Sequence, residues 1–489
     1  MKTDYQVGII GAGFGGLIAA LKLKESGRRS FVIFERASEI GGTWRDNVYP
    51  GCACDVPSNV YSIASEPNPT WRTLFSKQPD ILKYLKNTVV KNDLSKHIRL
   101  NSDIIELKFI DTGGYWQVTD RNGIMTTVKM LLSATGPLNR AVIPKFEGLE
   151  TFQGKSFHSS TWDNSVDIKG KRIAILGTGA SAIQIVPTIA PQVAQLYIFQ
   201  RTPAWIMPRN DRKISGFEHF LFKNLPFLQK LKREQEYWIA EFLGKAFVGH
   251  ETLYKILRFV ALKKLKDEVT DLQTRLKLTP QYKIGCKRVL ISDNYYPTFN
   301  RPNVALITGS IDKISNDSII TKDGQAHAVD IIVFATGFEA AEVAVYTKIY
   351  GKNGVNLIDE WAKTGAQAFH GTTVSNYPNL AFVLGPNTGL GHNSVVHMME
   401  SQMNYIIHYL TILEKSGEKA YLDVQPAIQK VHNDALQKQF ADTVWASGCS
   451  SWYLNNAGLN TTLYPRLTVQ FRKEMKQINE NDYSIVKTT

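Results

Sequence analysis

Two glycine-rich turns of the same type constrain the fold of this chain more than any other feature of the sequence. Each follows a short apolar run rich in β-branched residues and precedes residues with the apolar spacing of a helix, as in a strand–turn–helix unit. The first turn, G-x-G-x-x-G, is formed by Gly11, Gly13 and Gly16. The second, G-x-G-x-x-A, includes Gly177, Thr178, Gly179, Ser181 and Ala182. The turns predict two doubly wound α/β units in one chain.

The two units differ in the charge that ends their second strand. The apolar run 31–34 ends in Glu35 and the run 196–200 ends in Arg201, at the same distance from the first glycine of each turn. An acid at this position accepts hydrogen bonds from an unmodified ribose, whereas an arginine suits a ribose 2′-phosphate. The sequence therefore predicts an FAD-like dinucleotide at the first turn and NADPH at the second. This combination is typical of a flavin oxidoreductase.

A short repeated sequence indicates where the chain passes between the two units. Ala-Thr-Gly follows a buried apolar run at 134–136 and again at 335–337. We therefore expect an α/β fold in which two Rossmann-like dinucleotide-binding domains are nested and carry a helical insertion. The predicted segments are an FAD-binding domain at 1–145 and 340–489, a linker at 146–169, an NADPH-binding domain at 170–212 and 283–339, and the helical insertion at 213–282.

Composition excludes several function classes. The net charge of +13 is compatible with nucleic-acid binding, but the basic residues are spread out and form no recognition motif, so no nucleic-acid partner is expected. No apolar run approaches the ~20 residues of a membrane span. No signal-peptide pattern precedes the first strand, so a cytoplasmic location is expected. No histidine and cysteine cluster has metal-ligand spacing, so no metal site is expected.

The four cysteines do not suggest a disulfide framework in a chain of 489 residues. Cys52 and Cys54 invite comparison with flavoprotein disulfide reductases, which place a cysteine pair beside the flavin. Those pairs are C-x-x-C or wider, whereas one residue separates Cys52 from Cys54. We therefore expect structural thiols.

The stretch 217–269 mixes aromatic and aliphatic residues with many lysines and arginines. Its apolar spacing is helical, as in Leu257, Val260, Ala261 and Leu265. We expect a helical insertion that packs on the main domains. The alternative is a basic amphipathic surface that contacts membranes or a hydrophobic substrate.

A twelve-residue pattern between the two units carries a family resemblance. The stretch 152–163 matches F-x-G-x-x-x-H-x-x-x-W-[P/D], with Phe152, Gly154, His158, Trp162 and Asp163 at the fixed positions. This resembles the fingerprint of the type I Baeyer–Villiger monooxygenases, in the class B flavin-dependent monooxygenase family, and the resemblance covers nearly the whole chain. It implies that the fingerprint couples cofactor binding to domain movement, with His158 transferring no proton. Taken alone, a linker histidine could also simply satisfy backbone groups.

The resemblance extends to the flavin and the reacting centre. Gly42, Thr43 and Trp44 match the segment that wraps the flavin ring, and Asp55 falls on the family's active-site aspartate. Arg288 takes the position of the catalytic arginine.

It extends also to the second cofactor. Lys287 and Arg201, with Thr202, take the positions that hold the NADPH 2′-phosphate. Trp452, in the segment 450–453, takes the position of a tryptophan that faces the nicotinamide ribose and the substrate.

The resemblance implies a defined reaction. NADPH reduces FAD, and O₂ adds to the flavin to give a C4a-peroxyflavin. This attacks a ketone, which rearranges to an ester or lactone. An arginine is always protonated, so Arg288 would keep the peroxide anionic, and Asp55 would orient the guanidinium through a bidentate contact. The expected partners are O₂ and a ketone, with sulfides as a further substrate class.

Other functions stay open at this point. A flavin monooxygenase that oxidises sulfur or nitrogen nucleophiles needs a protonated peroxyflavin, so Arg288, placed to keep the peroxide anionic, argues against this function. A flavin or disulfide reductase lacks support because there is no C-x-x-C pair, and a non-catalytic redox sensor is a third alternative. The glycine-rich segment 385–394 is more like the broader group of bacterial flavin monooxygenases. We expect it beside the flavin, with no catalytic role for His392. The sequence leaves the oligomeric state open.

Overall fold

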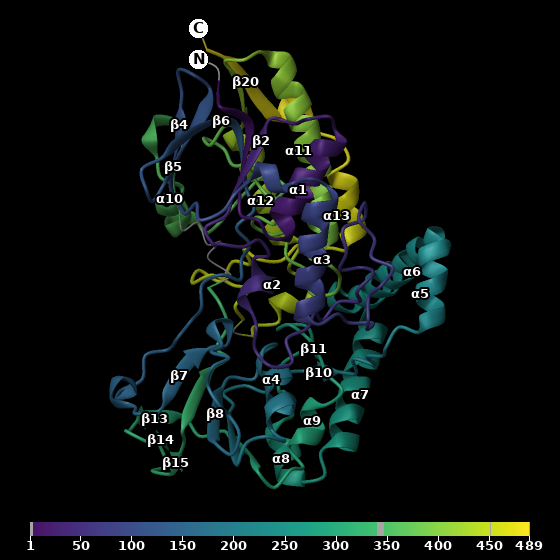
Figure 1. Ribbon diagram of the computed structural model, residues 1–489, viewed down its shortest axis with the longest axis vertical. Coiled ribbons are helices and arrows are strands. Elements are labelled where there is room, and N and C mark those ends of the chain that lie inside the picture. Colours follow the sequence, from purple (N-terminus) through teal and green to yellow (C-terminus); the bar gives the residue numbers. More distant parts are fainter. Residues whose placement is uncertain (1–2, 340–346, 450, 489) are drawn as a thin grey trace.

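Two sheets, one for each glycine-rich turn, form the two lobes of the molecule (Figure 1). The computed structural model describes residues 3–339, 347–449 and 451–488. The domain boundary predicted at residue 340 and the residue Ser450 lie outside this part of the chain.

The first sheet has the strand order β17-β4-β5-β6-β1-β2-β3, and β18 pairs with β6. Its strands are β1 (Tyr5–Ile10), β2 (Phe31–Phe34), β3 (Ile98–Arg99), β4 (Ile104–Ile110), β5 (Tyr115–Asp120), β6 (Met125–Ser133), β17 (Lys348–Tyr350) and β18 (Leu380–Phe382). β1 pairs in parallel with both β2 and β6. β2 is apolar throughout because both faces of this part of the sheet are covered. Strands from the tail of the chain thus complete a sheet that the amino-terminal segment begins.

Helices cover the first sheet and extend its lobe. The helix α1 follows the first glycine turn and packs against α11, so that α1 is buried over most of its length. The helices of this lobe are α1 (Phe14–Glu25), α2 (Thr43–Asp46), α3 (Gln78–Lys91), α10 (Leu357–Thr364), α11 (Val395–Ser416), α12 (Pro426–Lys438) and α13 (Thr468–Glu474). An antiparallel pair, β19 (Ala420–Val424) and β20 (Tyr483–Lys487), lies near the carboxyl end.

The second sheet is entirely parallel, with the order β12-β9-β8-β16-β7. Its strands are β7 (Lys155–His158), β8 (Arg172–Leu176), β9 (Gln195–Phe199), β12 (Val304–Ile307) and β16 (Ile331–Phe334). Part of the stretch predicted as a linker is therefore the edge strand β7. Smaller elements of this lobe are α4 (Ala182–Ile189), α9 (Tyr295–Thr298), the parallel pair β10 (Ile206–Met207) and β11 (Leu290–Ile291), and the antiparallel β13 (Ile311–Ile314), β14 (Ser318–Thr321) and β15 (Ala326–Ala328).

The repeated Ala-Thr-Gly sequences occupy equivalent places in the two lobes. Ala134 donates its backbone N–H to Ile10 at 2.9 Å, and Ala335 donates to Leu176 at 2.9 Å. A Cβ atom on Gly11 would lie 2.7 Å from the Ala134 carbonyl oxygen, and one on Gly177 would lie 2.5 Å from that of Ala335. Both glycines also have positive φ, +102° and +108°. Neither position accepts a side chain, so the first glycine of each turn is a requirement of the backbone.

The two connections that leave these repeats run side by side between the lobes. Val142 donates its N–H to the Gly337 carbonyl at 2.9 Å, and Glu339 donates to the Arg140 carbonyl at 3.0 Å. The Thr336 hydroxyl donates to the Val142 carbonyl. The chain thus crosses between the lobes at the two places that the repeat indicates, as Figure 1 shows.

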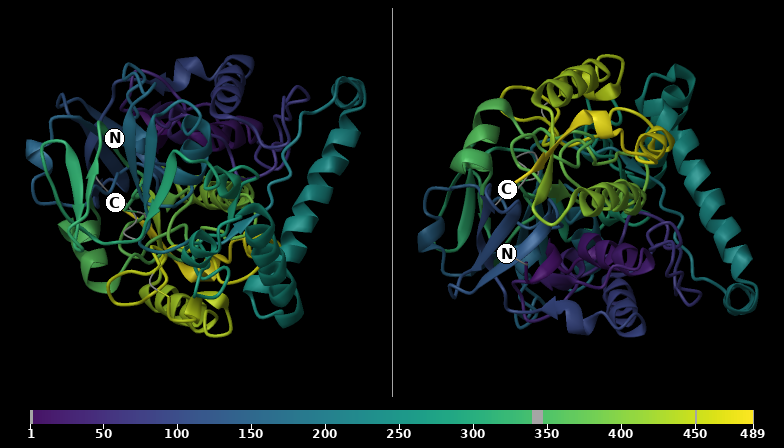
Figure 2. Two further views of the ribbon diagram at one scale, coloured as in Figure 1. Left: turned by 90° about the horizontal axis from the view of Figure 1, so that it is seen from below. Right: turned by 90° about the horizontal axis from the view of Figure 1, so that it is seen from above.

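The expected helical insertion is confirmed. It comprises α5 (Gly216–Asn224), α6 (Pro226–Gly244), α7 (Glu251–Glu268) and α8 (Leu272–Lys277). Leu257, Ala261 and Leu265 of α7 are buried, as the packing interpretation predicts. The helix α6 instead runs along the outer edge of the molecule (Figure 2). No helix among residues 3–339, 347–449 and 451–488 has the length and apolar character to cross a membrane.

Two of the four cysteines are free thiols and the other two form a disulfide. Cys52 and Cys54 are buried free thiols, and burial raises the pKa of Cys52 to about 11. A protonated buried thiol is unreactive, which agrees with the structural role expected for this pair. Cys286 and Cys449, however, form a disulfide across 163 residues of sequence. Sequence reasoning did not find this pair because a long-range link between two lone cysteines leaves no local pattern.

The two turns should differ in whether their third fixed position tolerates the methyl group of alanine. A Cβ atom on Gly16 would lie 1.9 Å from the Gly11 carbonyl oxygen, whereas the second turn has Ala182 there. We expect Gly16→Ala to cost roughly 1–3 kcal/mol or more of stability, because overpacking shifts the turn, and to release the flavin. The flavin-to-protein absorbance ratio and the melting temperature measure this. The control Ala182→Gly should retain flavin, and full flavin with unchanged melting in Gly16→Ala would contradict the assignment.

Candidate active site

The first glycine turn lies against the segment expected to wrap the flavin. The Gly41 N–H donates to the Ala12 carbonyl at 3.0 Å. A Cβ atom on Gly42 would lie 3.2 Å from the Gly13 Cα atom. Trp44, buried in α2, donates its indole N–H to the Tyr61 hydroxyl at 3.1 Å. The close approach of two glycines keeps the surface of this turn free of side chains, as a pyrophosphate site needs.

Glu35 fixes the end of β2 to the first turn. The side chain is buried, and its Oε2 atom accepts the Ala12 N–H at 2.9 Å. Its Oε1 atom accepts from the Ala37 N–H at 3.0 Å and from Arg45 at 2.9 Å. A carboxylate has about four acceptor sites, so Glu35 keeps capacity for a ribose hydroxyl.

The second glycine turn presents an open backbone surface. A Cβ atom on Gly179 would meet no described atom within 4 Å. The Thr178 hydroxyl donates to the Thr202 carbonyl at 3.1 Å, which joins the turn to the segment after β9. Ser181 directly precedes α4. The positive dipole end of this helix therefore follows the turn directly, which suits a bound anion.

Two cations lie near each other beside this turn. Arg201 is exposed and makes no hydrogen bond or ion pair to residues in the described ranges. The pKa of Lys287 is lowered, first by burial and then by the positive charge of Arg201. The Lys287 ammonium also lies 5.1 Å from the centre of the Tyr282 ring. A phosphate bound between the two cations would relieve their repulsion, which fits a 2′-phosphate site.

Asp55 and Arg288 form an ion pair where the two lobes meet. The Arg288 Nε and Nη2 atoms donate to Asp55 Oδ2 at 3.0 and 2.6 Å. The expected bidentate contact to both carboxylate oxygens is therefore not formed, because the two donors converge on one oxygen. The negative charge of Asp55 raises the pKa of Arg288. The two side chains are 28% and 33% exposed, so small molecules can reach the pair.

Two residues that sequence reasoning missed hold the loop that carries Asp55. Gln184 of α4 accepts from the Tyr49 hydroxyl at 3.0 Å and from the Ala53 N–H at 3.3 Å, and its amide donates to the Ala53 carbonyl at 2.9 Å. Arg209 donates to the Cys54 carbonyl at 3.1 Å. A long amide side chain in an otherwise apolar helix is the signal that could have identified Gln184. Both residues belong to the second lobe, so the Asp55 loop is fixed from that side.

The disulfide brings a distant segment to the ion pair. Cys286 lies two residues before Arg288, and its partner Cys449 lies three before Trp452. Tyr453 is buried, which raises its pKa to about 12, while the nearby charge of Arg288 opposes this rise. Trp452 is 43% exposed, with its ring 4.4 Å from that of Tyr453. Tyr453 thus lies near the Asp55–Arg288 pair, and Trp452 is its neighbour in the chain.

The fingerprint residue His158 lies at the crossing between the lobes. It is buried at the end of β7, paired with the end of β16, and its ring centre is 5.4 Å from that of Phe338. Its Nδ1 atom accepts the Ser160 N–H at 3.1 Å, and burial lowers the pKa of the ring. A neutral, buried imidazole fits a structural position. Trp162 is buried against Phe157, with ring centres 5.2 Å apart.

The glycine-rich segment 385–394 contacts the insertion. His392 and Asn393 both lie within hydrogen-bond distance of Glu241 on α6, at 3.2 and 2.9 Å. His392 therefore has a structural partner, and the position of this segment beside the flavin stays a prediction.

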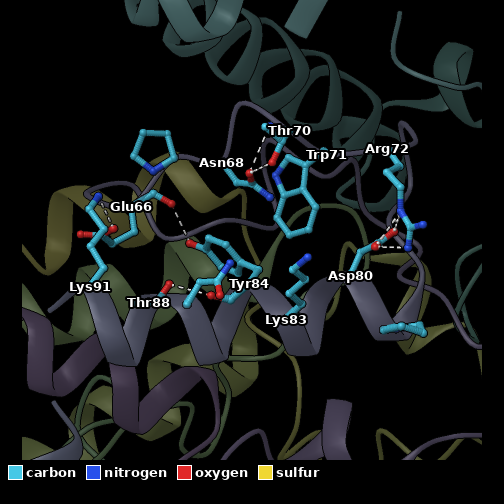
Figure 3. Close-up of a pocket in the computed structure, with 13 residues that line it drawn as sticks. Glu66, Asn68, Thr70, Trp71, Arg72, Asp80, Lys83, Tyr84, Thr88 and Lys91 are labelled. Carbon is cyan, nitrogen blue, oxygen red and sulfur yellow. Dashed lines mark hydrogen bonds and ion pairs between the residues drawn. The ribbon is translucent and has the colours of Figure 1, made fainter. Parts of the chain in front are cut away.

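A surface pocket of about 460 Å³ lies between the loop at 66–72 and α3 (Figure 3). Its polar side chains largely pair with each other, as in Arg72 with Asp80 and Lys91 with Glu66. Its lining residues include none of those predicted to bind a cofactor. The described residues also contain no cluster of three metal-ligating side chains. The Asp55–Arg288 pair and the two glycine turns are therefore the candidate active site.

The known proteins that this chain resembles include flavin monooxygenases. The family model of flavin-binding monooxygenase-like proteins matches residues 4–342. A Baeyer–Villiger monooxygenase of Streptomyces coelicolor is 42% identical over 99% of this chain and 93% of its own length. One from Pseudomonas aeruginosa is 42% identical over 99% of this chain and 92% of its own. A crystal structure of OTEMO with FAD and NADP has a TM-score of 0.89 at 28% identity, covering 99% of this chain and 100% of that one. This chain therefore belongs to the flavin-binding monooxygenase-like family.

Proposed function

We propose that this protein is an FAD- and NADPH-dependent Baeyer–Villiger monooxygenase, which inserts one oxygen atom of O₂ beside a ketone carbonyl to give an ester or lactone. The Asp55–Arg288 ion pair carries the proposal, because it places a permanent positive charge between the two dinucleotide turns. The relatives that share 42% identity with the chain bear the name of this activity.

The residues present fit both cofactors. At the first turn, the approach of Gly13 to Gly42 and the buried Glu35 suit FAD. At the second, the open Gly179 backbone and the adjacent cations Arg201 and Lys287 suit NADPH. Bound FAD, once reduced by NADPH, supplies the activation of O₂.

Arg288 contributes electrostatic stabilisation. Its contact with Asp55 uses Nε and Nη2, which leaves Nη1 to donate to an oxyanion. A guanidinium keeps its proton throughout, so it stabilises negative charge on the reacting oxygen without supplying an acid. Asp55 orients the guanidinium and is itself held by the loop that Gln184 and Arg209 fix. Trp452 would cover the site and limit the entry of water.

Product analysis under ¹⁸O₂ tests the function. Purified enzyme with FAD and NADPH is given cyclic, linear and aryl ketones and one sulfide. We expect one labelled oxygen atom in an ester or lactone. Sulfoxide formation with no ester from any ketone would instead indicate an enzyme that oxidises heteroatoms, and would contradict the proposal.

Arg288→Ala should separate flavin reduction from oxygen insertion. Because the guanidinium acts on the oxygen-bearing centre, we expect anaerobic flavin reduction by NADPH to be nearly unchanged. Ester formation should fall by about 10²–10³, the cost of losing one preorganised charge contact. Stopped-flow reduction and product yield measure the two steps. The control Arg212→Ala removes a surface arginine paired with Glu218 and should leave both unchanged. Substantial ester formation by Arg288→Ala would overturn the assignment.

Arg201→Ala should weaken the binding of NADPH and leave that of NADH nearly unaffected. A hydrogen bond to a charged group contributes roughly 1.5–3 kcal/mol, so the KM for NADPH should rise about tenfold to a hundredfold. Steady-state kinetics with both nucleotides measure the effect. The control Lys169→Ala removes an exposed cation of the same lobe and should change neither KM. Equal changes for NADPH and NADH in Arg201→Ala would show that Arg201 does not contact the 2′-phosphate.

A further inference from the structure

The helix α6 has its polar and apolar sides reversed. A surface helix normally buries an apolar stripe and presents charged residues to water. In α6 the buried or half-buried side instead carries mainly polar residues, with Tyr237 the one large aromatic residue among Gln229, Arg233, Glu236 and Glu241. The exposed side carries Phe227, Leu231, Trp238, Ile239, Phe242 and Leu243, which are 40–59% exposed. Hydrophobic burial within this chain therefore does not account for the apolar side of α6.

The polar side of α6 is firmly fixed. Glu241 accepts from His392 and Asn393 and from the backbone N–H of Val469 at 3.0 Å, and these contacts lower its pKa to about 2. Gln229 donates to the Asn68 carbonyl at 2.7 Å. Arg233 donates to the Asn59 carbonyl at 2.9 Å on the same side. Rotation of α6 to bury its aromatic residues would break this network, so the apolar side stays exposed.

The apolar side continues onto α5. Phe217 and Phe220 are 70% and 61% exposed, and Leu225 between the helices is 42% exposed. In Figure 2 both helices lie at the edge of the molecule, with their outer sides away from the two lobes. We call Phe217, Phe220, Leu225, Phe227, Leu231, Trp238, Ile239, Phe242 and Leu243 the apolar face. A set of exposed apolar side chains on two helices that contact each other points to an interaction surface.

The fully exposed charges around the apolar face have a single sign. Over residues 213–245, all of them described, the charged side chains classed as exposed are Lys213, Lys223, Lys230 and Lys245. Lys245 lies over the Phe242 ring, 5.6 Å from its centre. The acids of this stretch are buried or half-buried: Glu218 is paired with Arg212, Glu241 lies on the inner side, and Glu234 is half-buried. The surface is thus aromatic and aliphatic with a border of lysines.

We propose that the apolar face binds the surface of a membrane that contains anionic lipids, with α6 lying in the plane of the interface. Tryptophan, phenylalanine and leucine flanked by lysines are the composition of interfacial helices. Each lysine near an anionic surface adds an attraction that is lost with neutral lipid. A second copy of the chain fits less well, because pairing two such faces would bring two lysine borders together without an exposed acid in the stretch.

Vesicle co-sedimentation of the holoenzyme tests the proposal. Vesicles of phosphatidylcholine with phosphatidylglycerol should bind the enzyme, and vesicles of phosphatidylcholine alone should bind it much less. The triple variant Leu231→Gln, Trp238→Gln and Phe242→Gln should lower the partition coefficient at least tenfold. These three side chains are more than half exposed, so circular dichroism and NADPH oxidation should stay unchanged. The triple variant Lys223→Gln, Lys230→Gln and Lys245→Gln should lose about fivefold per lysine on the anionic vesicles only.

Matched control residues lie in the first lobe, at the start of β6. Ile124→Gln with Met125→Gln removes two apolar side chains of similar exposure, 59% and 61%, and should leave vesicle binding unchanged. Equal binding by wild type and the α6 triple variant would overturn the proposal. Sedimentation velocity, which measures the oligomeric state, provides a second test. A wild-type dimer that the α6 variant converts to a monomer, with no binding to either vesicle, would assign the apolar face to a second copy.

Discussion

A close backbone contact, made twice, governs the architecture of this protein. The first glycine of each turn packs against the carbonyl of an alanine that ends a neighbouring strand, and no side chain fits between them. This contact places both turns at the carboxyl ends of their parallel strands, where dinucleotides bind in doubly wound folds. It also sets the direction in which the chain leaves each sheet, so that the two connections at 137–142 and 336–339 meet between the lobes.

The charged residues of the two lobes differ, and each set suits a different part of a dinucleotide. Glu35 is buried and shared among backbone N–H groups, which suits an uncharged ribose. Arg201 and Lys287 repel each other, which suits a phosphate dianion. Between them, Arg288 has a partner in Asp55 and still has free N–H groups. Under the proposed function, an arginine would therefore serve cofactor selection at position 201 and charge stabilisation at position 288 because its neighbours differ.

The sequence predicts the features that depend on local spacing. The glycine turns, the charge at the end of each second strand and the helical insertion are encoded within short windows, and the structure has all of them at those positions. The Gln184 contacts, the Cys286–Cys449 disulfide and the reversed sides of α6 depend on residues more than a hundred positions apart. Spacing alone cannot identify such partners. The apolar spacing of the stretch 217–269 predicts helices correctly. The polar side of α6 is buried, however, because it binds Asn393 and other residues distant in the sequence.

The attachment of the Asp55 loop has a mechanical consequence. Asp55 belongs to the segment that follows the flavin turn, yet Gln184 and Arg209 fix its loop to the lobe that also carries Arg288. The same loop is also bound to the first lobe, since Cys54 donates its N–H to the Ser76 carbonyl at 2.9 Å and Gln78 donates its N–H to the Cys52 carbonyl at 2.9 Å. A hinge motion between the lobes would therefore have to break contacts on one side of this loop. The Asp55–Arg288 pair thus lies at a joint that both lobes hold, and it opposes relative movement of the two dinucleotide turns.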